Sequence, residues 1–98
     1  MTKNTKQADS VKGVFIVLND RGLHTRPSTE LVKCASGFRS EVTLYYRKTK
    51  VNAKSLLGIL MLTACKGARV RVEATGEDAH FAVAEIKSLA ARNFNIEY

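Results

Sequence analysis

Several features that mark specialised classes of protein are missing from this sequence of 98 residues. No apolar stretch is long enough to span a membrane or to form the core of a signal peptide, so we expect a cytoplasmic protein that does not insert into membranes. The two cysteines, Cys34 and Cys65, are too few and too far apart for a disulfide framework or a CxxC site. No cluster of side chains with metal-ligand spacing is present, and we expect neither a metal nor a cofactor.

The chain also lacks internal repeats, low-complexity tracts and linkers, and its length allows one domain with one core. Residues 1–10 are almost entirely polar, so we expect a disordered tail there and one folded domain over residues 11–98. The net charge of +7 comes from scattered basic residues, which is typical of a solvated surface. Tyr45 and Arg71 keep an RNA-binding surface open as an alternative. However, no RNP1-like string or GxxG loop is present, so we expect no nucleic-acid partner.

The single proline lies in the stretch around which the chain is organised. Pro27 suits the first turn of a helix, and the residues up to Ala35 are mostly good helix formers. His24 would then lie just before the helix, beside amide groups and a positive dipole end that stabilise an anion. Arg26 adds a guanidinium group suited to phosphoryl oxygens. Because the helix terminus disfavours imidazolium, we expect a neutral His24 that can attack phosphorus.

A histidine at such a junction also has a simpler explanation, which is that it caps the helix or fills a surface turn. Two motifs favour the functional explanation. Residues 22–27 read Gly-Leu-His-Thr-Arg-Pro and resemble the active-site signature of HPr, the histidine phosphocarrier family of the phosphoenolpyruvate-dependent sugar phosphotransferase system. Residues 52–58, Asn-Ala-Lys-Ser-Leu-Leu-Gly, are similar to the segment that carries this family's regulatory serine, and the turns at 66–68 and 75–78 also match.

Hydrophobic periodicity predicts the order strand, helix, strand, strand, helix, strand, helix. The strands are expected at residues 11–18, at 41–46, in a short segment ending near 53, and at 69–75. Asp78 is expected to cap the last helix, and Phe81 and Phe94 are expected to serve in packing. This order indicates an α+β protein with an antiparallel sheet covered on one face. The resemblance implies the HPr-like open-faced β-sandwich, a four-stranded sheet with three helices on one face.

The resemblance also implies a phosphoryl carrier that is not an independent enzyme. His24 would accept a phosphoryl group on Nδ1 from the phosphohistidine of enzyme I, which phosphoenolpyruvate charges, and would pass it to a histidine of an EIIA-type domain. The residues expected to hold the phosphoryl group are Thr25, Arg26, Pro27 and Ser28. The alternative is a regulatory HPr paralogue that acts through protein contacts and not through sugar transport.

Ser55 is a good N-cap for a short helix at residues 56–61, and serine is common there for structural reasons alone. The resemblance aligns Ser55 with the serine that a dedicated kinase, HPr kinase/phosphorylase, phosphorylates in many HPr proteins. The run that follows is too apolar for one helix face to bury, so part of it should form a docking patch. The other possibility for so short a run is a fully buried helix. The resemblance implies that Leu56, Leu57 and Leu60 form a partner-binding patch and that Lys33 matches a basic position of the family, and Thr29 is expected to bind partners with them. We expect the carrier to be a monomer.

Three residues depart from the pattern of the family. Arg21 stands where a small polar residue commonly precedes Gly-Leu-His, and Thr63 stands where glycine often lies beside the phosphate. Either departure could change the lifetime of the phosphohistidine or the choice of partner. Ser28 stands where alanine is usual, and it fits as a tolerated residue in the first helical turn.

Overall fold

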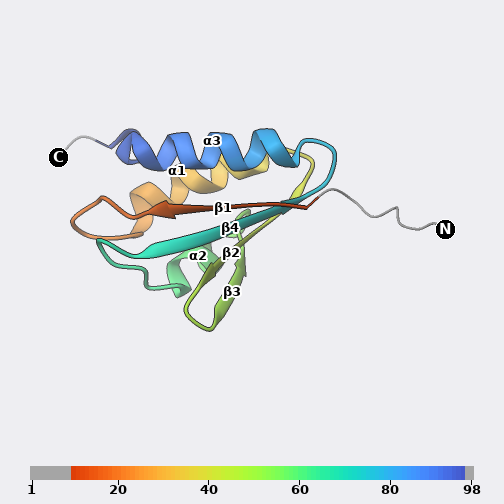
Figure 1. The fold of residues 1–98 in the computed structure, drawn as a ribbon. Helices are drawn as coiled ribbons and strands as arrows, with labels where there is room; N and C mark the ends of the chain where they lie inside the picture. Colours follow the sequence, from red (N-terminus) through yellow and green to blue (C-terminus); the bar gives the residue numbers. More distant parts are fainter. Residues whose placement is uncertain (1–9, 97–98) are drawn as a thin grey trace.

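The structure is a computed structural model that describes residues 10–96, and its elements follow the predicted order (Figure 1). The strands are β1 (Ser10–Ile16), β2 (Glu41–Tyr46), β3 (Thr49–Asn52) and β4 (Arg69–Thr75). The helices are α1 (Thr25–Ser36), α2 (Leu56–Met61) and α3 (Ala79–Ala91), and one 3₁₀ turn, η2 (Asn93–Asn95), follows α3. The tail predicted for residues 1–10 lies outside the described residues except for Ser10, which is the first residue of β1.

The four strands form one antiparallel sheet in the order β1-β4-β2-β3. In this sheet Phe15 of β1 pairs with Val70 of β4, and Leu44 of β2 pairs with Val72 of β4. Figure 1 shows α1 and α3 side by side over one face of the sheet, and α2 packs against α1 and β3. The predicted α+β open-faced sandwich is therefore confirmed.

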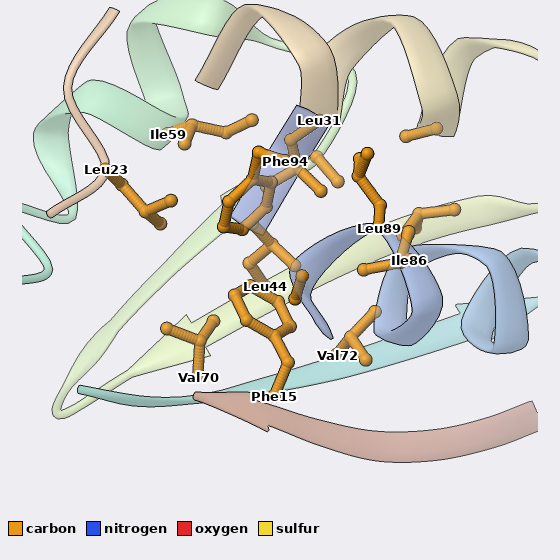
Figure 2. Close-up of a cluster of buried hydrophobic side chains, with 14 of the residues drawn as sticks. Phe15, Leu23, Leu31, Leu44, Ile59, Val70, Val72, Ile86, Leu89 and Phe94 are labelled. Atoms are coloured by element: carbon orange, nitrogen blue, oxygen red, sulfur yellow. The ribbon is translucent and has the colours of Figure 1, made fainter. Parts of the chain in front are cut away.

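The core lies between the sheet and the helices, as the alternation along the strands predicts. Phe15 and Val17 are buried, whereas Val14, Ile16 and Leu18, which alternate with them, are exposed. In Figure 2, side chains from the sheet meet Leu31 of α1 and Phe94 of η2. The residues predicted as the buried stripe of α3 are all buried: Ala79, Ala82, Val83, Ile86, Leu89 and Ala90. Removal of this apolar surface from water is the main stabilising term of such a fold.

At the last helix the predicted cap position of Asp78 is confirmed, but its side chain has another role, and the predicted packing of Phe81 is wrong. Asp78 occupies the N-cap position of α3, but its side chain makes no capping hydrogen bond. Its carboxylate instead accepts hydrogen bonds from the N–H groups of Arg39 and Ser40, at 2.9 and 3.0 Å, and from the Ser40 hydroxyl. Phe81 was expected to pack but is 70% exposed, whereas Phe94 is fully buried as predicted. Asp78 therefore joins the α1–β2 loop to the start of α3.

Candidate functional site

His24 ends a tight loop that follows β1. The Gly22 N–H donates to the carbonyl of Asn19 at 3.0 Å, and the Arg21 N–H donates to the Asn19 side-chain oxygen at 2.8 Å. Gly22 has φ of +73°, and a Cβ atom there would lie 2.4 Å from the carbonyl oxygen of Ala64. Glycine is therefore required at residue 22, because both the backbone conformation and the available space exclude a side chain.

The loop is also tied to the segment that follows α2. The Leu23 N–H donates to the Ala64 carbonyl at 2.9 Å, and the Leu23 side chain is buried. Farther out, the Lys66 ammonium lies 2.7 Å from the Asp20 carboxylate in an exposed ion pair. The position of His24 thus depends on residues that are distant in the sequence.

His24 itself is the N-cap residue of α1, as the position of Pro27 predicted. It has extended backbone angles, φ of −80° and ψ of −168°, and its carbonyl accepts the first helical hydrogen bond from the Ser28 N–H at 3.1 Å. Its side chain makes no capping hydrogen bond. The imidazole therefore does not cap the helix, whereas the other simple explanation, that it fills a surface turn, is not tested by this geometry.

The surroundings of His24 disfavour the imidazolium form. Burial of the half-buried ring lowers the pKa of His24 below its ordinary value, and the positive charges of Arg21 and Arg26 lower it further. The sequence predicted this direction from the helix terminus alone, and the structure adds burial and two cations, Arg21 and Arg26. A neutral imidazole flanked by two guanidinium groups suits a nucleophile that acquires a negatively charged group.

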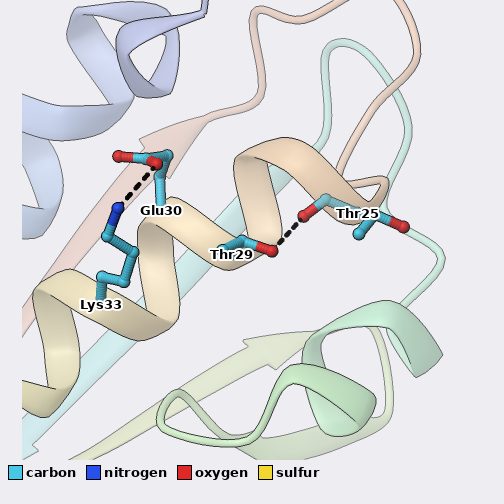
Figure 3. Close-up of polar contacts among 4 residues, drawn as sticks. All are labelled: Thr25, Thr29, Glu30 and Lys33. Atoms are coloured by element: carbon cyan, nitrogen blue, oxygen red, sulfur yellow. Dashed lines mark hydrogen bonds and ion pairs between the residues drawn. The ribbon is translucent and has the colours of Figure 1, made fainter.

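The first turn of α1 contains no acidic side chain, so nothing in it repels an anion. Pro27 has no N–H, and the Ser28 N–H donates to the His24 carbonyl, so neither residue offers a backbone donor to an anion. The Thr29 hydroxyl donates to the Thr25 carbonyl at 2.8 Å (Figure 3). Of the four residues predicted to hold the phosphoryl group, Pro27 and Ser28 are buried, and that role stays a prediction for all four.

Lys33 lies two turns along the same helix, where its ammonium group approaches the Glu30 carboxylate at 3.4 Å (Figure 3). The Lys33 side chain is largely exposed. Lys33 is therefore accessible to an acidic partner. The predicted partner contacts of Lys33 and of Thr29 stay predictions.

The C-terminal turn lies beside the first turn of α1, and sequence reasoning missed this neighbour of the site. A cavity of about 240 Å³ is lined by Thr25, Arg26, Thr29, Glu30, Asn95 and Ile96. Asn93, Phe94 and Asn95 have φ of 56°, 56° and 60°, so three successive residues are left-handed. The buried Phe94 ring, in edge-to-face contact with Phe15 at 6.0 Å between centroids, holds this turn in place. Asparagine tolerates left-handed angles, so the Asn-Phe-Asn sequence was the signal that could have indicated the turn.

The predicted docking patch lies on α2. Leu57 is 68% exposed and Leu56 is also exposed, whereas Leu60 is half-buried. Met61, which the sequence analysis did not select, is 65% exposed. Ser55 caps α2 as predicted, since its hydroxyl oxygen accepts a hydrogen bond from the Gly58 N–H at 3.0 Å. The exposed part of this helix is thus Leu56, Leu57 and Met61, directly after Ser55.

Residues 11–92 match the family model described as "PTS HPr component phosphorylation site", which covers most of the chain. The chain belongs to the HPr family. Among curated relatives, the phosphocarrier protein HPr of Xylella fastidiosa (strain 9a5c) is 41% identical over 81 residues, which are 83% of this chain and 91% of that protein. The family resemblance drawn from the two motifs is therefore confirmed, and the chain is an HPr-type phosphocarrier of the phosphotransferase system.

Solved structures of HPr proteins share the fold. HPr of Thermoanaerobacter tengcongensis superposes with a TM-score of 0.85 at 33% identity, over 90% of this chain and 99% of that one. The catabolite repression protein Crh of Bacillus subtilis, described as a swapped dimer, has a TM-score of 0.69 at 33% identity, over 76% and 86% of the two chains. The HPr fold of this chain is thus established from sequence and structure together.

Two negative findings complete the site. Within residues 10–96, no group of three or more histidine, cysteine or carboxylate side chains is placed to hold a metal ion. None of the helices in the described part of the chain is long and apolar enough to cross a membrane.

The structure shows a physical effect for two of the departures from the family pattern, Arg21 and Thr63. Arg21 lies close enough to His24 to lower its pKa. Thr63, directly before Ala64, has φ of 50°, a left-handed conformation that costs a β-branched residue more than glycine. The glycine that the family often has at this position therefore has a conformational explanation, because glycine adopts this φ without strain. Thr63 adopts the same φ with a strained backbone.

Proposed function

We propose that this chain relays a phosphoryl group through His24, from the phosphohistidine of enzyme I to a histidine of an EIIA-type domain. The observation that carries the proposal is the position of the half-buried His24 at the start of α1, where burial and the charges of Arg21 and Arg26 lower the pKa of its ring. The family membership supports the direction of the relay, with enzyme I as donor and EIIA as acceptor.

The chemistry requires little from the protein beyond positioning and charge. The lone pair of His24 Nδ1 forms a bond to phosphorus as the bond between phosphorus and the donor nitrogen breaks, and that electron pair returns to the donor imidazole. The same step runs in the opposite sense on the acceptor domain. Arg26 and Arg21 stabilise the charge on the phosphoryl oxygens, together with the first-turn amides. Since a nitrogen–phosphorus bond forms as another breaks, the transfer is nearly balanced and needs no metal on this chain.

The sequence contains two histidines, which provides a matched test. The purified protein is incubated with enzyme I, phosphoenolpyruvate and Mg²⁺, and acid-labile phosphate is measured. We expect one phosphoryl group on the wild type and none on His24→Ala. His80→Ala should behave as the wild type, because His80 lies on the exposed side of α3 and not at the start of α1. Labelling of His24→Ala, or a wild type that takes up no phosphate, would contradict the proposal.

We further propose that Ser55 is a second, regulatory phosphorylation site for an ATP-dependent kinase. Its partly exposed hydroxyl precedes the exposed Leu56 and Leu57. A phosphate there would add about −1.5 to −2 charges next to an apolar docking surface. Kinase and ATP should then give acid-stable phosphate on the wild type and on Ser88→Ala but not on Ser55→Ala, and the product should accept phosphate from enzyme I more slowly. No acid-stable phosphate on the wild type would refute this second site.

A second candidate function is a regulatory paralogue that acts through protein contacts and not through sugar transport. The likeness to Crh and the exposed patch on α2 favour it. It would be preferred if the wild type bound regulators through the patch but accepted no phosphate from enzyme I.

A further inference from the structure

Ser28 has an unusual place for a hydroxyl group. It lies in the first turn of α1 and is fully buried. Its hydroxyl donates to the carbonyl oxygen of Leu23 at 3.0 Å, and its backbone N–H donates to the carbonyl oxygen of His24 at 3.1 Å. A single residue therefore binds the two successive carbonyl groups on either side of His24 Cα.

The two bonds act on different peptide planes. The peptide between Leu23 and His24 is held at its carbonyl by the Ser28 hydroxyl and at its N–H by the Gly22 carbonyl, at 2.9 Å. The next peptide, between His24 and Thr25, is held at its carbonyl by the Ser28 amide. Any residue except proline at position 28 could supply the amide bond, whereas the bond to Leu23 requires a side-chain donor.

The Leu23 carbonyl would lose this side-chain donor if the hydroxyl were removed. The Ser28–Leu23 bond lies in the interior, and a buried carbonyl that loses its donor tends to move toward water. The N–H of Leu23 stays bound to Ala64, so the movement would be a rotation of the Leu23–His24 peptide. The imidazole follows that rotation because it is attached to the same Cα.

We propose that in this chain Ser28 is a positioning residue, whose hydroxyl and amide restrain the backbone on both sides of His24 and so raise the rate of phosphoryl transfer above the rate that an alanine at this position would give. This inference rests on the proposed function, since it concerns the same reaction. It assigns to Ser28 a role through its hydroxyl and the Leu23 carbonyl, in place of a direct contact with the phosphoryl group. In-line transfer between two imidazoles is sensitive to small errors in the position of the nucleophile.

The test compares Ser28→Ala with Ser40→Ala. Ser40 is also buried and also donates its hydroxyl to an acceptor in another segment, Asp78, but it lies in the loop after the C-terminal end of α1. Phosphorylation by enzyme I and phosphoenolpyruvate is measured as a function of carrier concentration. We expect kcat of Ser28→Ala to fall roughly three- to tenfold with KM unchanged, because the docking patch on α2 is untouched. Ser40→Ala should lower thermal stability without changing kcat.

A second readout does not depend on the partner proteins. Amide hydrogen exchange of His24, whose N–H is bonded to Gly22, should accelerate in Ser28→Ala and stay unchanged in Ser40→Ala. If wild-type protein is phosphorylated and Ser28→Ala matches it in both kcat and exchange, the positioning role is refuted while the carrier function stands. If wild-type protein takes up no phosphate, the carrier function fails, and accelerated exchange in Ser28→Ala alone would still support the backbone restraint.

Discussion

The Leu23 N–H donates to the carbonyl oxygen of Ala64 at 2.9 Å and so joins the loop that carries His24 to the segment after α2. This bond requires a close approach of the two backbones, which Gly22 permits because it has no side chain. The geometry at His24 is therefore set by a contact between two loops, and not by α1 alone.

Replacement of Gly22 should disturb this contact directly. In Gly22→Ala the new Cβ would lie 2.4 Å from the Ala64 oxygen at a φ of +73°, so both a clash and backbone strain oppose folding. We expect a loss of about 2–4 kcal/mol in the free energy of unfolding, measured by urea denaturation. Gly67→Ala is the matched control, because φ is also positive there, +88°, but a Cβ atom would meet no neighbouring atom within 4 Å. Its free energy of unfolding should fall by only about 1 kcal/mol. Equal losses in the two variants would mean that the contact with Ala64 has no role.

Replacement of Thr63, which directly precedes Ala64, should have the opposite effect on stability. Its φ of 50° is unfavourable for a β-branched residue, so Thr63→Gly should raise the free energy of unfolding by up to about 1 kcal/mol. The phosphohistidine lifetime, followed by loss of acid-labile phosphate, should stay unchanged if Thr63 acts only through conformation. A shorter or longer lifetime would assign to the Thr63 side chain a direct influence on the phosphoryl group.

The pH dependence of His24 follows from its surroundings. Burial and the nearby guanidinium groups lower the pKa of His24 below its ordinary value near 6.5, so the ring should stay neutral until the pH falls below that value. Arg21→Gln removes one repelling charge and should raise this pKa, which an NMR titration of the ring protons measures. Arg69→Gln removes a charge from an exposed residue of β4 and should leave the pKa unchanged. Equal midpoints in wild type and Arg21→Gln would contradict the electrostatic role of Arg21.

The predicted docking patch on α2 can be tested without affecting the fold. Leu57 and Phe81 are exposed to similar extents, 68% and 70%, but they lie on α2 and α3 respectively. We expect Leu57→Ser to raise severalfold the KM of enzyme I for this carrier, because the loss of an apolar side chain that anchors an interface costs about 1 kcal/mol or more in binding. Phe81→Ser should leave KM unchanged, and thermal melting should confirm that both variants are folded. A larger effect of Phe81→Ser would place the interface on α3.

Much of the fold could be predicted because its signals are local. The buried stripe of α3 and the alternating faces of β1 and β4 follow from periodicity, and Pro27 and Ser55 mark the starts of α1 and α2. The family motif indicated His24 and Arg26, since the residue types that the chemistry needs are adjacent in the sequence.

The parts that could not be predicted depend on partners distant in the sequence. Asp78 has the sequence of a helix cap, yet its carboxylate binds Arg39 and Ser40, which only the packed structure brings near. The bond from Ser28 to Leu23 and the approach of Asn95 to the first turn of α1 have the same origin. Local patterns predict the elements, whereas the geometry of the site depends on how the loops meet.

The central claim is that His24 relays a phosphoryl group, and onward transfer tests it most directly. Protein labelled with ³²P through enzyme I is purified away from enzyme I and phosphoenolpyruvate and then mixed with an EIIA-type domain. The account predicts that the label leaves this chain and appears as acid-labile phosphate on the EIIA domain, in proportion to the EIIA domain added. Label that stays on His24, or that is released only as inorganic phosphate while the EIIA domain stays unlabelled, would contradict it.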